Sequence, residues 1–274
     1  MTATTGPEGT RWPGGRRLRD GHELYWWVEL IVIVVVYLVY SEIRNSSTAG
    51  AQRAYENALR IIDWQGVVHL NIEQAWQDAV IGFEPLLIVA NYFYGSAYII
   101  VSILALVFLF RLHPEDYPLW RNTLAFGTVL ALIGFAFFPL MPPRLLPTMD
   151  PSAFHYVDTL AELPTFWSFN DEAMAKISNQ YAAMPSLHCG WALWVCAVFY
   201  PRVRTWWAKA LSVAYVVATV VTVIITANHY VLDAVGGFAV FGVGYGLARL
   251  VTRAGRSEPE PEAATAGGSA EQRA

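Results

Sequence analysis

Six long apolar runs constrain the fold of this 274-residue chain more than any other feature. A helix needs about 20 apolar residues to cross a bilayer, and only 15% of the residues are charged, against about 25% in soluble domains. The sequence therefore predicts an all-α, polytopic integral membrane protein with six transmembrane helices. The expected spans are residues 25–40, 83–110, 124–140, 187–199, 208–225 and 231–251.

The segments outside these runs have different compositions. Residues 51–78 alternate apolar and charged side chains, which predicts a helix lying in the membrane interface after the first span. The end of the chain is rich in Glu, Ala and Pro, which is typical of disorder. We expect an N-terminal arm (1–24), a six-helix membrane catalytic domain (25–252) and a disordered tail (253–274). The first span reads as an uncleaved anchor, with a cleaved signal peptide as the alternative.

Arginine and lysine are distributed unevenly between the connecting segments. Clusters precede the first span, join the second to the third and the fourth to the fifth, and follow the sixth. Cytoplasmic segments carry the excess of positive charge. The sequence therefore predicts a multi-pass protein of the cell membrane with both termini in the cytoplasm. Residues 141–185 and the turn at 226–230 then lie on the extracytoplasmic side.

Two short strings on that side carry ionisable groups at the edges of apolar runs. Pro185-Ser186-Leu187-His188 opens the fourth span, and His229-Tyr230-Val231-Leu232-Asp233 opens the sixth. Asp233 lies four residues after His229, one helical turn away, where it can hold the imidazole ring. Ionisable groups at membrane depth are costly and usually functional.

This combination favours phosphoryl chemistry. A neutral imidazole can attack phosphorus to form a phosphohistidine, and a second imidazole can protonate the leaving oxygen. Arg144, in the predicted extracytoplasmic segment, can bind a phosphoryl group in bidentate fashion. His188, His229 and Asp233 lack a further carboxylate or cysteine ligand at useful spacing, so we expect no metal and no cofactor. The small net charge of −4 and the absence of a basic stripe argue against nucleic acid as a partner.

The motifs resemble those of the type-2 phosphatidic acid phosphatase superfamily. The resemblance is carried by Met141-Pro142-Pro143-Arg144-Leu145-Leu146-Pro147, by Met184-Pro185-Ser186-Leu187-His188 and by Asn228-His229-Tyr230 with Asp233, and it covers about residues 91–237. More closely, the chain resembles the inositolphosphotransferase-like branch, the relatives of inositol phosphorylceramide synthase. The resemblance implies a metal-independent phosphohistidine mechanism. It makes His229 the nucleophile, Asp233 its orienting partner, His188 the leaving-group acid, and Arg144 and Ser186 phosphate ligands.

Three positions depart from the superfamily pattern. Phe137 and Val223 stand where a lysine and an arginine are expected, and Leu187 replaces a glycine. Two phosphate-binding cations are therefore missing. Either other polar residues compensate, or the substrate is a phosphodiester, which carries less charge than a monoester. The candidates for compensation are Arg60, Arg121, Lys176 and Asn228.

The sequence thus predicts a membrane lipid phosphotransferase or phosphatase. Its substrate would be a membrane phospholipid or prenyl phosphate, and a hydroxyl compound would accept a transferred headgroup such as inositol phosphate. A simple lipid or prenyl phosphate phosphatase is the alternative within the same class. A small-molecule transporter or channel, with the histidines and Arg144 lining a polar pathway, is the alternative of another class, although no internal repeat supports it.

Overall fold

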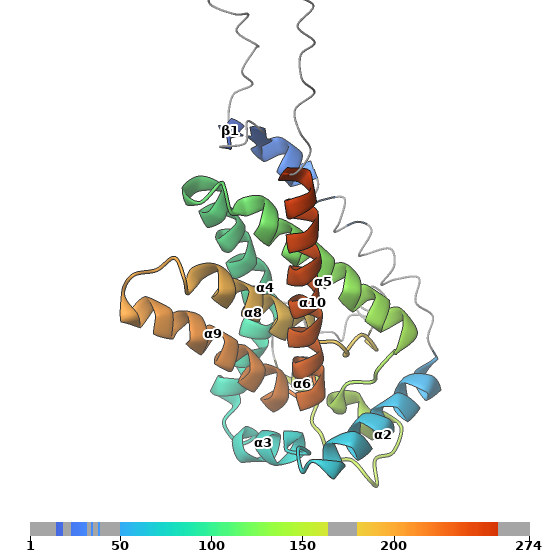
Figure 1. Cartoon of the computed structure of the whole chain (residues 1–274). Coiled ribbons are helices and arrows are strands. Elements are labelled where there is room, and N and C mark those ends of the chain that lie inside the picture. Colours follow the sequence, from blue (N-terminus) through green and yellow to red (C-terminus); the bar gives the residue numbers. More distant parts are fainter. Residues whose placement is uncertain are drawn as a thin grey trace, which may run out of the picture.

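The computed structural model describes residues 15–18, 23–31, 34, 38, 50–163 and 180–256, and within them the chain is mostly helical (Figure 1). Five apolar helices form a bundle, in which α10 packs mainly against α5 and α8, while α8 also contacts α4 and α9. These helices are α4 (Glu84–Leu112), α5 (Tyr117–Phe137), α8 (Leu187–Phe199), α9 (Trp206–Ile225) and α10 (Val231–Arg256).

Among the described residues, four helices are long and apolar enough to cross a membrane, namely α4, α5, α9 and α10. The 13-residue α8 has the predicted bounds but is too short to span alone. Residues 26–31 begin a helix, but most of the expected first span lies outside the described residues. The chain is thus a membrane protein by its apolar helices, and the count of six remains a prediction.

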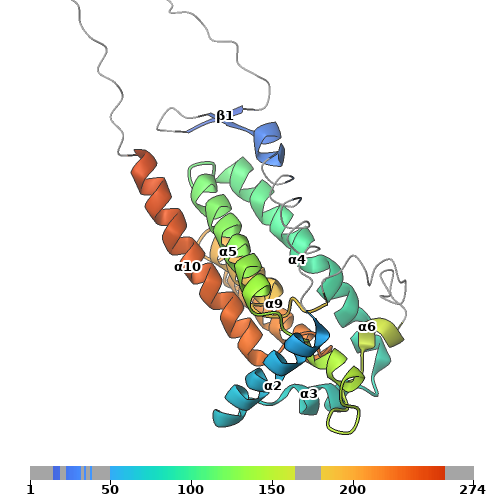
Figure 2. The same ribbon diagram turned by 90° about the vertical axis from the view of Figure 1, so that its right-hand side faces the viewer.

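One expectation about the remaining elements was wrong. The amphipathic segment is two helices, α2 (Ala51–Val67) and α3 (Glu73–Val80), because the chain turns between them at His69, where φ is 55°. The mostly helical fold class is confirmed, with one short addition: β1 (Gly15–Arg17) and β2 (Glu23–Tyr25) pair as an antiparallel ribbon. Figure 2 shows α2 and α3 crossing one end of the bundle, with the ribbon beyond the other end.

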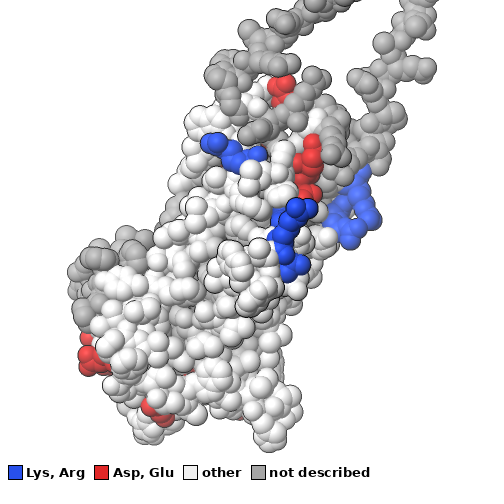
Figure 3. All heavy atoms as spheres, turned by 90° about the vertical axis from the view of Figure 1, so that its left-hand side faces the viewer, with Lys and Arg blue, Asp and Glu red and all other residues white. Residues whose placement is uncertain are grey.

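Positive charge gathers at the end of the bundle nearest this ribbon. Arg121 of α5 pairs with Glu29 at 2.6 Å, and Arg202 after α8 pairs with Asp116 at 2.6 Å, so the chain segments at this end are joined by ion pairs. On the face drawn in Figure 3, Lys and Arg side chains lie in the upper part, whereas the broad remainder is largely uncharged. This separation of charge along the bundle agrees with the uneven distribution of arginine in the sequence.

Glycines allow α10 to approach its neighbours closely. A Cβ added to Gly244 would lie 2.7 Å from the backbone nitrogen of Gly127 in α5, and one added to Gly237 would lie 2.2 Å from the carbonyl oxygen of Ser186. Both contacts are with backbone atoms, which cannot rotate away as a side chain can. The start of α8 is therefore held against the first turns of α10.

We expect Gly237→Ala to lower the free energy of unfolding by about 1–3 kcal/mol, since the added methyl group must push Ser186 away. Gly242→Ala is the matched control, because nothing lies within 4 Å of its added Cβ and alanine is the better helix former. Thermal unfolding of both variants in one detergent measures the difference. Equal midpoints for the two variants would contradict the close approach.

Candidate active site

The turn between α9 and α10 builds the centre of the candidate site. The backbone N–H groups of Asn228 and His229 both donate to the carbonyl oxygen of Val223, at 3.0 and 3.2 Å, and Ala227 adopts a positive φ of 51°. The side chain of Asn228 is fixed as well, since its Nδ2 donates to Thr226 Oγ1 at 2.8 Å. The loop therefore presents Asn228 and His229 in one defined orientation before the helix begins.

Asp233 organises the first turn of α10 around His229. One carboxylate oxygen of Asp233 lies 3.3 Å from His229 Nδ1 and accepts the backbone N–H of Tyr230 at 3.0 Å. Both side chains are almost fully buried, at 4% and 0% exposed. Within the part of the chain that the structure describes, no hydrogen-bond partner reaches His229 Nε2. The predicted pair is thus formed, with the far nitrogen of His229 left for another group.

The second histidine comes from α8. The ring centroid of His188 lies 5.6 Å from that of His229, with the planes inclined at 59°. Two rings of α4 hold His188 in place, because Tyr94 stacks on it at 4.2 Å and Tyr98 meets it edge-on at 4.4 Å. The two histidines predicted from separate motifs therefore face each other across the junction of three helices.

Ser186, at the start of α8, fixes the position of the helical turn that carries His188. The Ser186 hydroxyl caps this helix by accepting the N–H of Cys189, at 3.4 Å, and Ser186 itself is fully buried. Its backbone N–H donates to the carbonyl oxygen of Asp233 at 2.9 Å. The predicted phosphate ligand Ser186 is thus joined directly to the first turn of α10, which follows His229.

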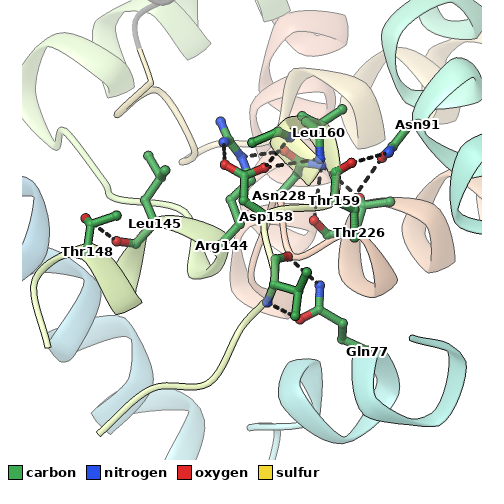
Figure 4. Close-up of polar contacts among 12 residues, drawn as sticks. Gln77, Asn91, Arg144, Leu145, Thr148, Asp158, Thr159, Leu160, Thr226 and Asn228 are labelled. Atoms are coloured by element: carbon green, nitrogen blue, oxygen red, sulfur yellow. Dashed lines mark hydrogen bonds and ion pairs between the residues drawn. The ribbon is translucent and has the colours of Figure 1, made fainter. Parts of the chain in front are cut away.

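Arg144 lies beside this centre. It belongs to the 3₁₀ turn η1 (Pro143–Thr148), and its backbone N–H donates to the carbonyl oxygen of Ala227 at 2.9 Å. Figure 4 shows its guanidinium between two partners: Nε donates to Asn228 Oδ1 at 2.9 Å, and a terminal nitrogen lies 2.5 Å from Asp158 Oδ2. The side chain is only 8% exposed. The arginine predicted from its proline-rich motif therefore contacts the residue that precedes His229.

A family model of the PAP2 superfamily matches residues 59–247. The chain belongs to the PAP2 superfamily. No curated protein and no solved structure matches it. Membership suggests phosphatase activity on lipid phosphoesters and makes an enzyme plausible. The inositolphosphotransferase-like branch is not confirmed, and the assignment to it stays a prediction.

Two polar residues that sequence reasoning missed cap α10 in this PAP2 protein. This helix begins two residues after His229. The first N–H groups of a helix have no partner inside it. In α10, the N–H of Val231 donates to Glu73 Oε1 at 2.9 Å, and that of Leu232 donates to Gln65 Oε1 at 2.9 Å. Gln65 Nε2 also donates to Glu73 Oε1 at 2.7 Å, and both side chains are buried. Residues from α2 and α3 therefore cap α10, the helix that begins two residues after the candidate nucleophile.

The negative charge of Glu73 also acts on its surroundings. Burial, and then the nearby carboxylates of Glu73 and Asp78, raise the pKa of Tyr156 above its ordinary value. No motif in the sequence indicated that Glu73 caps α10, because its partner Val231 lies 158 residues further along the chain. In the sequence, Glu73 stands out only as one of the charged residues of the amphipathic segment 51–78.

The candidates for replacing the missing PAP2 cations are distributed unevenly. Asn228 binds Arg144 in the site, whereas Arg121 pairs with Glu29 at the opposite end of the bundle. Arg60 is exposed on α2 and donates to the buried Asn57, and Lys176 lies outside the described residues. Of the four, Asn228 is the one that the described structure brings to Arg144.

The departing positions themselves also differ in environment. Phe137 is 76% exposed at the end of α5, whereas Val223 is fully buried and its carbonyl oxygen anchors the turn that holds His229. Within the described residues, no three His, Cys, Asp or Glu side chains gather as a metal centre requires. The polar side chains nearest to His229 are His188 and Asp233. Arg144 lies beside them with its partners Asn228 and Asp158.

Proposed function

We propose that this PAP2 protein is a membrane enzyme that breaks a phosphoester of a lipid through a phosphohistidine on His229 and passes the phosphoryl group to water or to a hydroxyl acceptor. The observation that carries the proposal is the pair of histidine rings, 5.6 Å apart, with Asp233 behind the Nδ1 of His229 and Nε2 unpartnered within the described residues. The substrate is a membrane phospholipid or a prenyl phosphate.

The first half of the reaction assigns one role to each histidine. When Nδ1–H of His229 donates to Asp233, the lone pair of Nε2 is available to attack phosphorus. The new P–N bond forms while the P–O bond to the leaving alcohol breaks. His188 donates its proton to that oxygen as general acid. Because the two rings come from different segments, α8 and the turn before α10, the phosphorus atom can lie between them in line with attack and departure.

The second half reverses these steps. Water or an acceptor hydroxyl attacks the phosphohistidine, His188 takes the proton of the attacking group, and the P–N bond breaks to regenerate His229. Arg144 binds the phosphoryl oxygens, supported by Asn228, and Ser186 contributes its hydroxyl. This chemistry requires no metal ion.

We further propose six spans with both termini in the cytoplasm and the candidate site on the extracytoplasmic side of the cell membrane. Support comes from the arginines joined by ion pairs at the end of the bundle away from His229. By the positive-inside rule this end faces the cytoplasm. The amphipathic helices α2 and α3, whose side chains bind the first turn of α10, then lie in the outer interface.

The proposal is tested with detergent-purified protein and phosphate-labelled phosphatidic acid, phosphatidylinositol and a prenyl phosphate. We expect labelled protein whose phosphate is stable in base and released in acid, as a P–N bond requires, and undiminished turnover in EDTA. Free phosphate as product indicates hydrolysis, and a labelled acceptor indicates transfer. Turnover that disappears in EDTA, or turnover with no labelled protein under rapid quench, would contradict the mechanism.

A simple lipid phosphatase is the second candidate function, and membership of the PAP2 superfamily favours it. It uses the same residues and differs only in the group that attacks the phosphohistidine. Adding glycerol or inositol at rising concentration separates the two candidates. A transferase diverts label from free phosphate to the added alcohol, whereas a strict phosphatase releases phosphate at every concentration.

A further inference from the structure

The proposed phosphate-binding arginine already has a carboxylate partner. Asp158 Oδ2 lies 2.5 Å from a terminal nitrogen of Arg144, and the two side chains are only 20% and 8% exposed (Figure 4). Asp158 therefore lies in a partly desolvated ion pair with Arg144, which in turn contacts Asn228, the residue before the candidate nucleophile.

The orientation of this carboxylate is fixed. Its other oxygen accepts the backbone N–H groups of Leu160 and Ala161, at 3.2 and 3.3 Å, and so caps the short helix α6 (Thr159–Glu162). That helix is itself tied to α4, since Asn91 Nδ2 donates to the carbonyl oxygen of Thr159 at 2.8 Å. Asp158 therefore cannot turn away from Arg144 without breaking its helix cap.

Arg144 is equally constrained from the other side. Its Nε donates to Asn228 Oδ1 at 2.9 Å, and its backbone N–H donates to Ala227. The guanidinium thus lies between Asn228 and Asp158, next to the turn that carries His229. Any phosphoryl group bound by Arg144 in this position is also close to the charge of Asp158.

Phosphate monoesters and phosphodiesters differ in the charge that they would bring to Arg144 and Asp158. A phosphate monoester carries a charge of about −1.5 to −2 at neutral pH, because its second pKa is about 6. A phosphodiester carries a single negative charge. The positive charge of Arg144 is compensated by Asp158, and the two positions at which PAP2 proteins have further cations hold Phe137 and Val223. In a poorly hydrated site, repulsion from a fixed carboxylate grows with the charge of the ligand.

We propose that Asp158 selects the charge class of the substrate and favours a singly charged lipid phosphodiester over a dianionic monoester. This inference rests on the proposed function, in which Arg144 binds the phosphoryl group that His229 attacks. With a diester, the P–O bond to the lipid alcohol breaks, His188 protonates that oxygen, and the headgroup phosphate stays bound to His229 Nε2. Attack by a hydroxyl then transfers the headgroup, and His188 takes up the proton.

The test compares phosphatidic acid with phosphatidylglycerol of the same acyl chains, in wild type and in Asp158→Asn. Asparagine can still accept the two N–H groups of α6 but carries no charge. Release of diacylglycerol gives kcat/KM for both lipids. We expect Asp158→Asn to raise the ratio of monoester to diester kcat/KM about tenfold. Asp150→Asn is the matched control, because its carboxylate binds Ser152 and Ala153 in an exposed turn.

A binding measurement separates this inference from the proposed function. The dissociation constants of both lipids are measured with His229→Ala and with His229→Ala/Asp158→Asn, where no chemistry is needed. If no protein turns over lipid but the ratio of dissociation constants still shifts, the charge selection stands and the proposed function fails. If turnover occurs and neither ratio changes, the charge selection is overturned and the proposed function stands. If there is neither turnover nor a shift, both are overturned.

Discussion

Turnover of the lipid phosphoester is expected to fall at least about 10⁴-fold when His229 is replaced by alanine. The variant removes the attacking atom itself, and the covalent label on the protein should disappear with it. Small groups of cooperating catalytic residues lose most of their activity when one member is removed. The measurement is kcat/KM for the best lipid substrate, together with the amount of phosphate bound to the protein.

His113→Ala is the matched control for this experiment. His113 follows the last residue of α4, where its ring packs against Phe108 at 5.1 Å, and it lies at the arginine-bearing end of the bundle. Its removal tests whether the loss of any histidine impairs the protein in detergent. Equal turnover by His229→Ala and wild type would rule out the phosphohistidine mechanism.

Replacing Asp233 by asparagine is expected to lower kcat by about 10²- to 10⁴-fold and to change KM little. An asparagine amide can donate to Nδ1 of His229, which leaves the proton on Nε2 and removes the attacking lone pair. The same oxygen of Asp233 accepts the N–H of Tyr230 at 3.0 Å, so an amide nitrogen in its place also gives up this capping bond, at a cost of about 1 kcal/mol of stability. Steady-state kinetics and thermal unfolding of the same preparation separate the two effects.

Asp116→Asn is the control for that substitution. Asp116 forms its ion pair with Arg202 at the other end of the bundle, and its side chain is 48% exposed. Such a pair contributes at most about 1 kcal/mol, so activity should stay close to that of wild type. A wild-type kcat in Asp233→Asn would show that His229 needs no orienting carboxylate.

The sequence indicated which residues lie together around His229 better than it indicated the surroundings that hold them, and the roles of these residues stay predictions. His188, His229, Asp233 and Arg144 stood out because ionisable groups at the edges of apolar runs are rare and because their order resembled a known family. The i,i+4 spacing of His229 and Asp233 also predicted their contact directly, and α8 has the bounds expected from its apolar run. Residue spacing, apolar runs and the order of motifs can all be read directly from the sequence.

Asp158, Glu73 and Gln65 were missed for a physical reason. Glu73 and Gln65 act through partners 158 and 167 residues away, and Asp158 pairs with Arg144, 14 residues earlier and outside any one helix. Polar residues between apolar ones are also the ordinary pattern of a solvated face. The amphipathic segment was read as one helix because its periodicity continues through residues 68–72, whereas the structure ends α2 at Val67 and turns at His69. Where tertiary contacts determine the end of a helix, the local pattern of apolar and polar residues does not predict that end.

The capping of α10 by Glu73 and Gln65 has a consequence for how this protein responds to its lipid environment. Two helices that we place at the outer surface of the bilayer bind the first turn of α10, directly after His229. Bilayer thickness and lateral pressure act on helices at the membrane surface. We therefore expect the position of His229 to respond to the lipids around the protein. We expect activity to vary with acyl-chain length of the host bilayer even where the bundle itself is unchanged.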